Sequence, residues 1–136
     1  AHRFHDHEKE TIRIDMVKIE DNHIIFEELK RIGDSRLRTK NGEPEILTQI
    51  RNYREFLQCN KDRLAAYYKV LYRIKKELDL PVPSVDDVDS LTVDPEPQLL
   101  IANNYKKDTE DRKKRIDDIE RILSSANINY RIDNFV

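Results

Sequence analysis

The sequence predicts an α/β domain in which a mixed β-sheet is covered by helices on both faces. The first observation is a pair of β-branched and apolar runs, 11–19 and 24–30, which are typical of strands. Apolar residues occur on both faces of these runs, so both faces of the sheet need a cover. The second observation is that segments with helical and strand periodicity alternate along the rest of the chain.

Length and composition are those of a single folded domain. The chain has 136 residues, with 38% charged residues and a formal net charge of −2. We therefore expect residues 1–136 to form one domain with one core. No apolar run reaches the roughly 18 residues that cross a bilayer, and no signal-peptide pattern is present, so we expect a cytoplasmic (intracellular) protein without a membrane partner. The single cysteine, Cys59, excludes an internal disulfide and a Cys-based zinc site.

The two apolar runs are predicted to form one antiparallel hairpin. The polar pair Asp21 and Asn22 lies between them, and both residue types tolerate the positive φ of a tight turn. If these two residues form the loop, the register places Asp15 directly opposite Glu28. Val17 and Phe26 are then apolar neighbours on the same face.

Two helices are predicted after the hairpin. Apolar positions recur at helical spacing over 45–57, and Pro44 suits the start of that helix. Asn60 can cap a second helix, 60–79, which is followed by a proline. The predicted buried stripe of the second helix comprises Leu64, Tyr68, Leu71, Ile74 and Leu78.

The remaining segments complete the α/β pattern. Residues 81–97 hold all but one of the five prolines and are predicted to be an extended surface loop within the domain. A short buried strand is expected at 98–102, an amphipathic helix at 108–124 and an alternating strand at 128–132.

Asp15, Glu28 and Lys30 are the residues whose pattern indicates a metal-binding or catalytic site. Opposite residues in an antiparallel pair have β-carbons about 4.5–5.5 Å apart, and Lys30 follows Glu28 on the same face. Two neighbouring carboxylates repel unless a proton or cation lies between them, and such hard oxygen ligands favour Mg²⁺ or Mn²⁺. A bound cation can hold a phosphate oxygen and activate water, beside an ammonium that stabilises developing charge. The alternative is a pair of exposed acids neutralised by Lys30 and Arg13.

These residues resemble a known family of nucleases. Asp15 and the run Glu28-Leu29-Lys30 are similar to the Asp and Glu-x-Lys strands of the PD-(D/E)XK, or restriction-endonuclease-like, superfamily. Gln49 and Tyr53 are similar to the Gln-x-x-x-Tyr motif of its exonuclease and CRISPR-associated branches, and they share one face of the predicted helix. The resemblance covers residues 11–57 and implies a restriction-endonuclease-like sandwich.

The sequence also departs from the family pattern. Ile14 stands where the proline of the motif name would be. The family usually has a helix with an acidic residue before the hairpin, and only ten residues precede Thr11. The single nuclease-like domain is therefore expected to lack this helix, which an additional domain or a partner would supply.

The resemblance implies roles for the matching residues. Asp15 and Glu28 would be ligands of Mg²⁺ or Mn²⁺, and Lys30 would join them as the catalytic lysine. Gln49 and Tyr53 would support the site or contact DNA, although core packing is an equal explanation for Tyr53.

A basic segment follows the hairpin. Arg31, Arg36 and Arg38 lie in residues 30–40 with a single acid, Asp34, and are candidates for DNA contact. The alternative is a solvated loop.

The leading functional hypothesis is a divalent-metal-dependent nuclease that hydrolyses phosphodiester bonds in DNA, with RNA as the other possible substrate. The first alternative is a catalytically inactive nuclease-like domain that binds nucleic acid or protein within a larger protein. The second is a helical protein-interaction domain that uses the charged helices 60–79 and 108–124. Substrate strandedness and oligomeric state are left open.

The N-terminal histidines give a further, separate hypothesis. His5 and His7 would share one face of a strand and, with His2, Asp6 and Glu8, suggest a transition-metal site. The alternative is an ordinary chain terminus or the first strand of the sheet.

Overall fold

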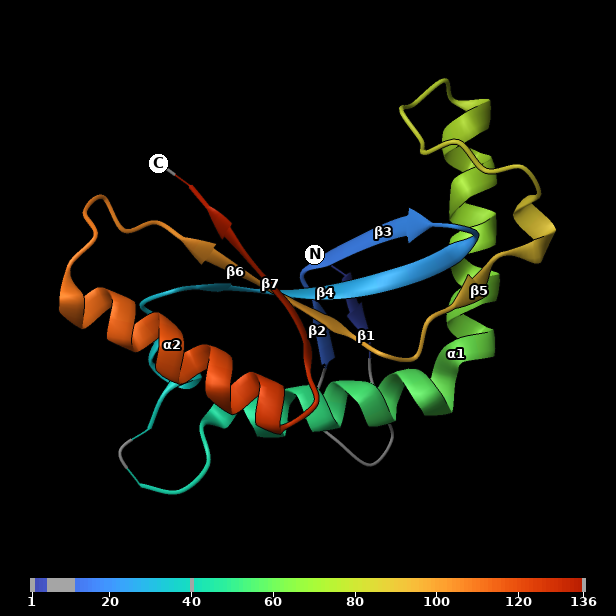
Figure 1. Ribbon diagram of the computed structural model, residues 1–136. Coiled ribbons are helices and arrows are strands. Elements are labelled where there is room, and N and C mark those ends of the chain that lie inside the picture. The colour runs from blue at the N-terminus through green and yellow to red at the C-terminus, as the bar shows by residue number, and fades with distance from the viewer. Residues whose placement is uncertain (1, 5–11, 40, 136) are drawn as a thin grey trace.

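The computed structural model describes residues 2–4, 12–39 and 41–135. Two helices and a mixed sheet make up most of this part of the chain (Figure 1). The elements are β1 (His2–Phe4), β2 (Ile12–Ile14), β3 (Met16–Glu20), β4 (His23–Arg31), the 3₁₀ turn η1 (Ser35–Leu37), α1 (Glu45–Glu77), the 3₁₀ turn η2 (Val88–Ser90), β5 (Thr92–Val93), β6 (Gln98–Asn103), α2 (Glu110–Ser125) and β7 (Asn129–Asn134).

The main sheet is mixed, as predicted. Its strand order is β3-β4-β6-β7, with β5 also beside β4. The β3/β4 pair is antiparallel, whereas β4/β6 and β6/β7 are parallel. A parallel pair needs a long crossover, and α1 and α2 provide the helices of the two crossovers. The predicted α/β class is therefore confirmed, and so are the predicted strand at β6, the helix at α2 and the strand at β7.

The hairpin has the predicted turn and register. Asp21 and Asn22 have φ angles of 48° and 62°, which the tight turn requires. Val17 lies opposite Phe26, as expected. The predicted single strand 11–19 is wrong, however, because the β3 ladder begins only at Met16 and β2 pairs with β1 instead.

Asp15 explains where the β3/β4 ladder ends. Its Oδ2 accepts the backbone N–H of Leu29 at 3.1 Å. A side chain that takes a backbone donor competes with the regular ladder. The chain therefore breaks its pairing at Asp15 and leaves this carboxylate beside β4.

The two predicted helices 45–57 and 60–79 are one helix, α1. No glycine or proline interrupts residues 45–77, and such residues are the usual cause of a break. Asn60 does not cap a helix, since its Nδ2 donates to the carbonyl of Phe56 at 2.8 Å. Figure 1 shows that α1 changes direction near its middle.

The predicted buried stripe of α1 is only partly correct. Leu64 and Tyr68 are buried, and Tyr72 is buried beside them. Ile74 and Leu78 are exposed, at 46% and 65%. The C-terminal part of α1 therefore extends beyond the core.

Both helices pack on the same face of the sheet. One apolar cluster joins Phe26 of β4 to Phe56 and other residues of α1. A second joins Leu99 of β6 to the start of α1 and to Ile119 of α2. Glu28 pairs with Leu99 across the β4/β6 ladder, so the two clusters share one face.

The prediction of helices on both faces is therefore wrong for the described residues. The opposite face carries Glu27, which is buried at 2% exposure. Lys18 Nζ lies 2.6 Å from Glu27 Oε1, and Arg131 approaches the other oxygen at 3.9 Å. Long charged side chains cover part of this face, because their alkyl stems can lie on apolar surface.

The segment 81–97 is less extended and less exposed than predicted. It contains η2 and β5, and β5 pairs in parallel with the start of β4. Leu91 and Val93 are buried in the first apolar cluster. Tyr72 of α1 donates its hydroxyl hydrogen to the carbonyl of Pro83 at 2.7 Å, which ties the segment to the helix.

Two further predictions concern membrane insertion and the N-terminal histidines. In the described part of the chain, neither helix combines the length and apolar character needed to cross a bilayer. His5, Asp6, His7 and Glu8 of the hypothetical transition-metal site lie outside the described residues, and only the backbone of His2 is described, in β1.

Candidate active site

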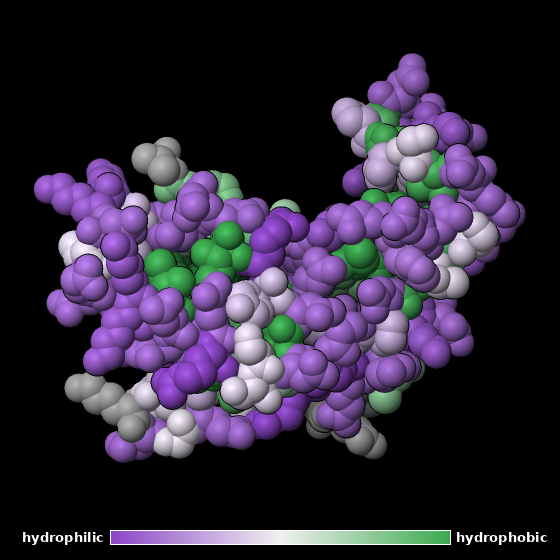
Figure 2. Space-filling model, viewed as in Figure 1, coloured by the Kyte–Doolittle hydropathy of each residue, from purple (hydrophilic) through white to green (hydrophobic). Residues whose placement is uncertain are grey.

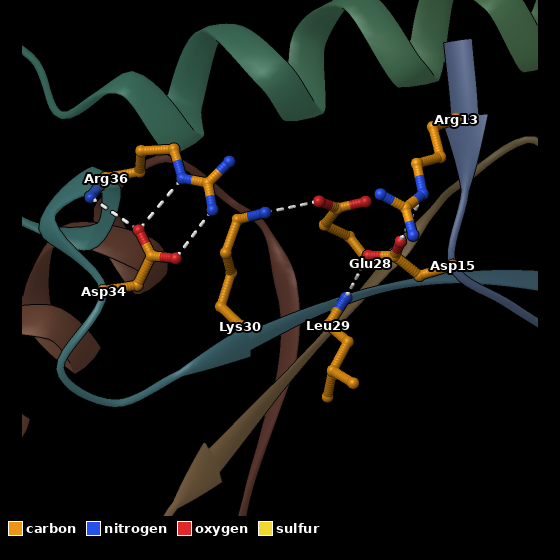
Figure 3. Close-up of polar contacts among 7 residues, drawn as sticks. All are labelled: Arg13, Asp15, Glu28, Leu29, Lys30, Asp34 and Arg36. Atoms are coloured by element: carbon orange, nitrogen blue, oxygen red, sulfur yellow. Dashed lines mark hydrogen bonds and ion pairs between the residues drawn. The ribbon is translucent and has the colours of Figure 1, made fainter. Parts of the chain in front are cut away.

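The three predicted catalytic residues meet beside the β4 strand. Glu28 and Lys30 are two positions apart on β4, so their side chains lie on one face. Asp15 is anchored next to them by the Leu29 N–H. Figure 3 shows Glu28 between Asp15 and Lys30. Asp15 and Glu28 thus lie on the same side of the sheet, as the hairpin register predicts.

Glu28 and Lys30 form a buried ion pair. Lys30 Nζ lies 2.5 Å from Glu28 Oε1, and the two side chains are only 4% and 14% exposed, respectively. Buried charges need such partners because the interior solvates them poorly. On the other side, Arg13 Nε is 3.8 Å from Asp15 Oδ1, and Arg13 is largely exposed. The acids therefore face one buried and one solvent-exposed cation.

The electrostatics of Glu28 favour a proton or a cation between the acids. Burial raises the pKa of Glu28, the hydrogen bond and charge of Lys30 oppose this shift, and the negative charge of Asp15 adds to it. The carboxylates of Asp15 and Glu28 therefore repel each other when both are ionised. A divalent cation would relieve this repulsion.

Tyr53 brings an uncommitted polar atom to the region of the acids, and Gln49 lies one turn before it on the same helix. Both residues lie on the first half of α1, and Tyr53 is 4% exposed. Within the described residues, Gln49 Oε1 and Tyr53 Oη are buried without a hydrogen-bond partner. Burial and then the charge of Glu28 raise the pKa of Tyr53, so its hydroxyl remains a neutral donor near the acids. An unsatisfied buried polar group costs roughly 1–3 kcal/mol, which a ligand or water can offset.

Asp34 and Arg36 form a second charged pair next to Lys30 (Figure 3). Arg36 donates from Nε and Nη2 to the two oxygens of Asp34, at 2.9 and 2.7 Å. These hydrogen bonds lower the pKa of Asp34 to about 2. Because the Nε and Nη2 edge of the guanidinium already binds a carboxylate, Arg36 contributes positive charge near the site but not a free pair of donors on that edge.

The other two predicted DNA-contacting arginines lie elsewhere. Arg38 approaches Asp118 of α2 at 3.5 Å. Arg31 follows Lys30 on β4 and therefore points to the opposite face. Only Arg36 of the three is close to the acids. The pairing of Asp34 with Arg36 was missed by sequence reasoning, although their spacing of two residues at the start of a 3₁₀ turn is a local signal for it.

The donor set suits a hard cation better than a transition metal. In the part of the chain that the structure describes, no group of three or more His, Cys, Asp or Glu side chains is arranged to hold a metal. Mg²⁺ commonly uses one or two carboxylates and keeps several waters. Asp15 and Glu28 fit this pattern.

A largely apolar cavity adjoins Asp15. It has a volume of about 230 Å³, and Asp15 forms part of its wall. Ile24, Tyr68, Leu71 and Pro83 are among its other lining residues.

The chain matches no protein-family model, no curated protein and no solved structure.

Proposed function

We propose that this chain is a divalent-metal-dependent nuclease domain with a restriction-endonuclease-like fold, and that it hydrolyses phosphodiester bonds in DNA. The observation that carries the proposal is the convergence of Asp15, Glu28 and Lys30 near the buried, unpartnered hydroxyl of Tyr53. Buried polar atoms usually have a hydrogen-bond partner, and a bound phosphate or water would provide one for the Tyr53 hydroxyl.

Asp15 and Glu28 would hold Mg²⁺ or Mn²⁺. When bound, such an ion supplies a Lewis acid for a phosphate oxygen and lowers the pKa of a coordinated water. The two carboxylates contribute the negative charge that retains it. The Asp15 side chain is fixed by the Leu29 N–H, so one ligand is oriented before binding.

Lys30 and Tyr53 would stabilise the reacting phosphate. The Lys30 ammonium is held by Glu28, so its charge is positioned at a buried point next to both acids. A preorganised cation in a poorly solvated site stabilises developing negative charge more strongly than one in water. The neutral Tyr53 hydroxyl can donate to a phosphate oxygen or to the attacking water. The cavity beside Asp15 leaves space for the sugar or base of the substrate.

A cleavage assay tests this proposal. Labelled single- and double-stranded DNA and RNA would be incubated with Mg²⁺ or Mn²⁺, and with EDTA as the blank. We expect metal-dependent cleavage that falls by roughly 10²-fold or more in Asp15→Asn and in Lys30→Met. Glu20→Gln, which changes an exposed acid on the same hairpin, is the matched control and should cleave like the wild type.

Metal binding gives a readout that does not depend on turnover. A ligand at 100 times its Kd stabilises the native state by about 2.7 kcal/mol, so Mg²⁺ should raise the thermal midpoint of the wild type. Asp15→Asn should lose this increase while Glu20→Gln keeps it. Absence of both cleavage and metal-dependent stabilisation in the wild type would contradict the nuclease proposal.

A second candidate function is protein interaction through the end of α1. Four large apolar residues are exposed at helical spacing along its C-terminal half and at its C-cap, and this apolar stripe comprises Tyr67, Val70, Ile74 and the C-cap residue Leu78. An exposed stripe of this kind is typical of a helix that receives a partner helix. Several Lys and Arg side chains flank it, so an amphipathic helix with acidic flanks is the best-matched partner.

The apolar stripe can be tested without affecting the acids. We expect Val70→Asp combined with Ile74→Asp to leave folding and cleavage unchanged but to abolish binding to a protein that copurifies with the wild type. Binding has to be reproduced with the two purified proteins and by a peptide of the partner's acidic helix. Equal binding by the wild type and the double variant would rule out the stripe as the interface.

A further inference from the structure

A second, basic cleft lies at the ends of two parallel strands. It has a volume of about 620 Å³. It is bounded by the end of β4 and by the loop between β6 and α2, and its lining residues are Arg31, Gly33, Asp34, Asn104, Tyr105, Lys106 and Arg112. In open α/β sheets, ligands bind outside the carboxyl ends of the strands, which is where this cleft lies.

Three cations line the cleft without an opposing carboxylate. In the described ranges, no acidic side chain lies within ion-pair distance of Arg31, Lys106 or Arg112. Asp34, the acid in the lining, is already bound by Arg36. Because the whole chain has a formal net charge of −2, this positive charge is local. Figure 2 shows that hydrophilic residues cover most of the visible face, including the left side, where the β6–α2 loop lies in Figure 1.

The walls of the cleft are held by specific contacts. The guanidinium of Arg112 lies over the ring of Tyr105, with its carbon 4.6 Å from the ring centroid. Its Nη1 donates to the carbonyl of Lys107 at 2.9 Å. On the other wall, Arg115 donates to the carbonyls of Ile32 and Asp34, at 3.0 and 3.2 Å. These contacts hold Arg112 of α2 and the segment that follows Arg31 in place beside the cleft.

We propose that this basic cleft binds the phosphate groups of a nucleic-acid backbone. Lys and Arg side chains that neutralise phosphates release the counterions condensed on the nucleic acid, and this release drives association. Arg31 and Arg112 offer planar donors that match phosphate oxygens, and Lys106 adds a point charge. Gly33 leaves room beside them, since a Cβ at this position would meet nothing within 4 Å.

The cleft extends the proposed nuclease function and rests on it for its biological meaning. Arg31 and Lys30 are consecutive on β4 but point to opposite faces. A phosphate in the cleft therefore belongs to a different nucleotide from the one beside Glu28. The substrate is accordingly a polynucleotide that passes around the end of β4, rather than a single nucleotide.

Binding measurements in EDTA test the cleft separately from cleavage. A fluorescently labelled oligonucleotide would be titrated at several KCl concentrations with the wild type, Arg31→Gln/Lys106→Gln and Gly33→Asp. The double variant removes two cations, whereas Gly33→Asp adds an anion without removing a contact. The matched controls are Lys61→Gln/Lys76→Gln, two exposed lysines on α1, and the neutral Gly33→Asn. Circular dichroism verifies folding of each variant.

We expect the double variant and Gly33→Asp to bind at least about tenfold more weakly at low salt, and the double variant to lower the slope of log K against log salt by about 1–2. Both controls should bind like the wild type. Unchanged affinity and salt slope in the two cleft variants would overturn the proposal. So would a wild type that binds inorganic phosphate in the cleft but no oligonucleotide.

The same measurements separate the two proposals. If the wild type cleaves DNA while the cleft variants bind it normally, the cleft proposal fails and the nuclease proposal stands. If the wild type binds but never cleaves, and the cleft variants bind weakly, the cleft stands and the nuclease proposal fails.

Discussion

At the scale of single residues, Asp15 shows how one side chain can end a ladder and begin a site. Its carboxylate takes the Leu29 N–H, so the strand pairing stops where the acid is needed. Strand alternation predicted that Asp15, Glu28 and Lys30 share a face, because that requires only the turn position. The pattern could not predict that Lys30 would be buried against Glu28, since side-chain pairing depends on the helix packed above it.

Asp34 gives a prediction about pH. Its pKa falls from the usual 3.8 to about 2, so its carboxylate contributes stability above about pH 4 that is lost as the pH falls through 2. We expect Asp34→Asn to cost roughly 1 kcal/mol at neutral pH, after a reduction for solvent screening, and most of the difference to be lost at pH 2. Urea denaturation at both pH values measures it.

Asp89 is the matched control for this experiment. Its ion pair with Arg73 is exposed on both sides, at 79% and 51%, and such pairs contribute little. Asp89→Asn should leave the free energy of unfolding nearly unchanged at both pH values. A loss at neutral pH as large as that of Asp34→Asn would indicate that the shielded geometry of Asp34 has no special effect.

At the scale of elements, α1 shows that apolar periodicity predicts where a helix forms but not where it breaks or which part of its apolar face is buried. Helical spacing correctly indicated helix on both sides of Asn60. The residue preference for a cap then suggested a break, but a cap is a weak signal when no glycine or proline supports it. Periodicity also marked Ile74 and Leu78 as apolar-face residues, yet it cannot show whether that face meets a core or solvent.

Leu64 on this helix and Leu78 at its C-cap make the distinction measurable. Leu64 is 2% exposed and packs in the cluster around Phe26, whereas Leu78 is 65% exposed. We expect Leu64→Ala to lower the free energy of unfolding by roughly 2–5 kcal/mol, because it removes buried apolar surface and leaves a cavity. Leu78→Ala should change it by less than about 0.5 kcal/mol. Chemical denaturation of the two variants is a matched comparison, and equal losses would refute the assigned burial.

At the scale of the whole molecule, the helices lie on one face of the sheet rather than on two. The sequence pattern identified the sheet and its helices, since both follow from local periodicity. The side on which each helix packs depends on contacts between distant segments, such as Leu99 with Ile119. The charge pattern of the sequence could not predict the basic cleft either. This cleft brings Arg31 together with Lys106 and Arg112, which are far from it in the sequence.

The parallel pairing of β4 with β6 also affects how the molecule assembles. Glu28 lies beside Leu99, and the whole of α1 separates the two strands along the chain. A long loop has to close before this ladder can form, and such distant pairings slow folding. The hairpin can form early, but one edge of β4 stays open to misassembly until β6 arrives. We therefore expect the acids and the lysine to become rigidly placed only after β4 pairs with β6.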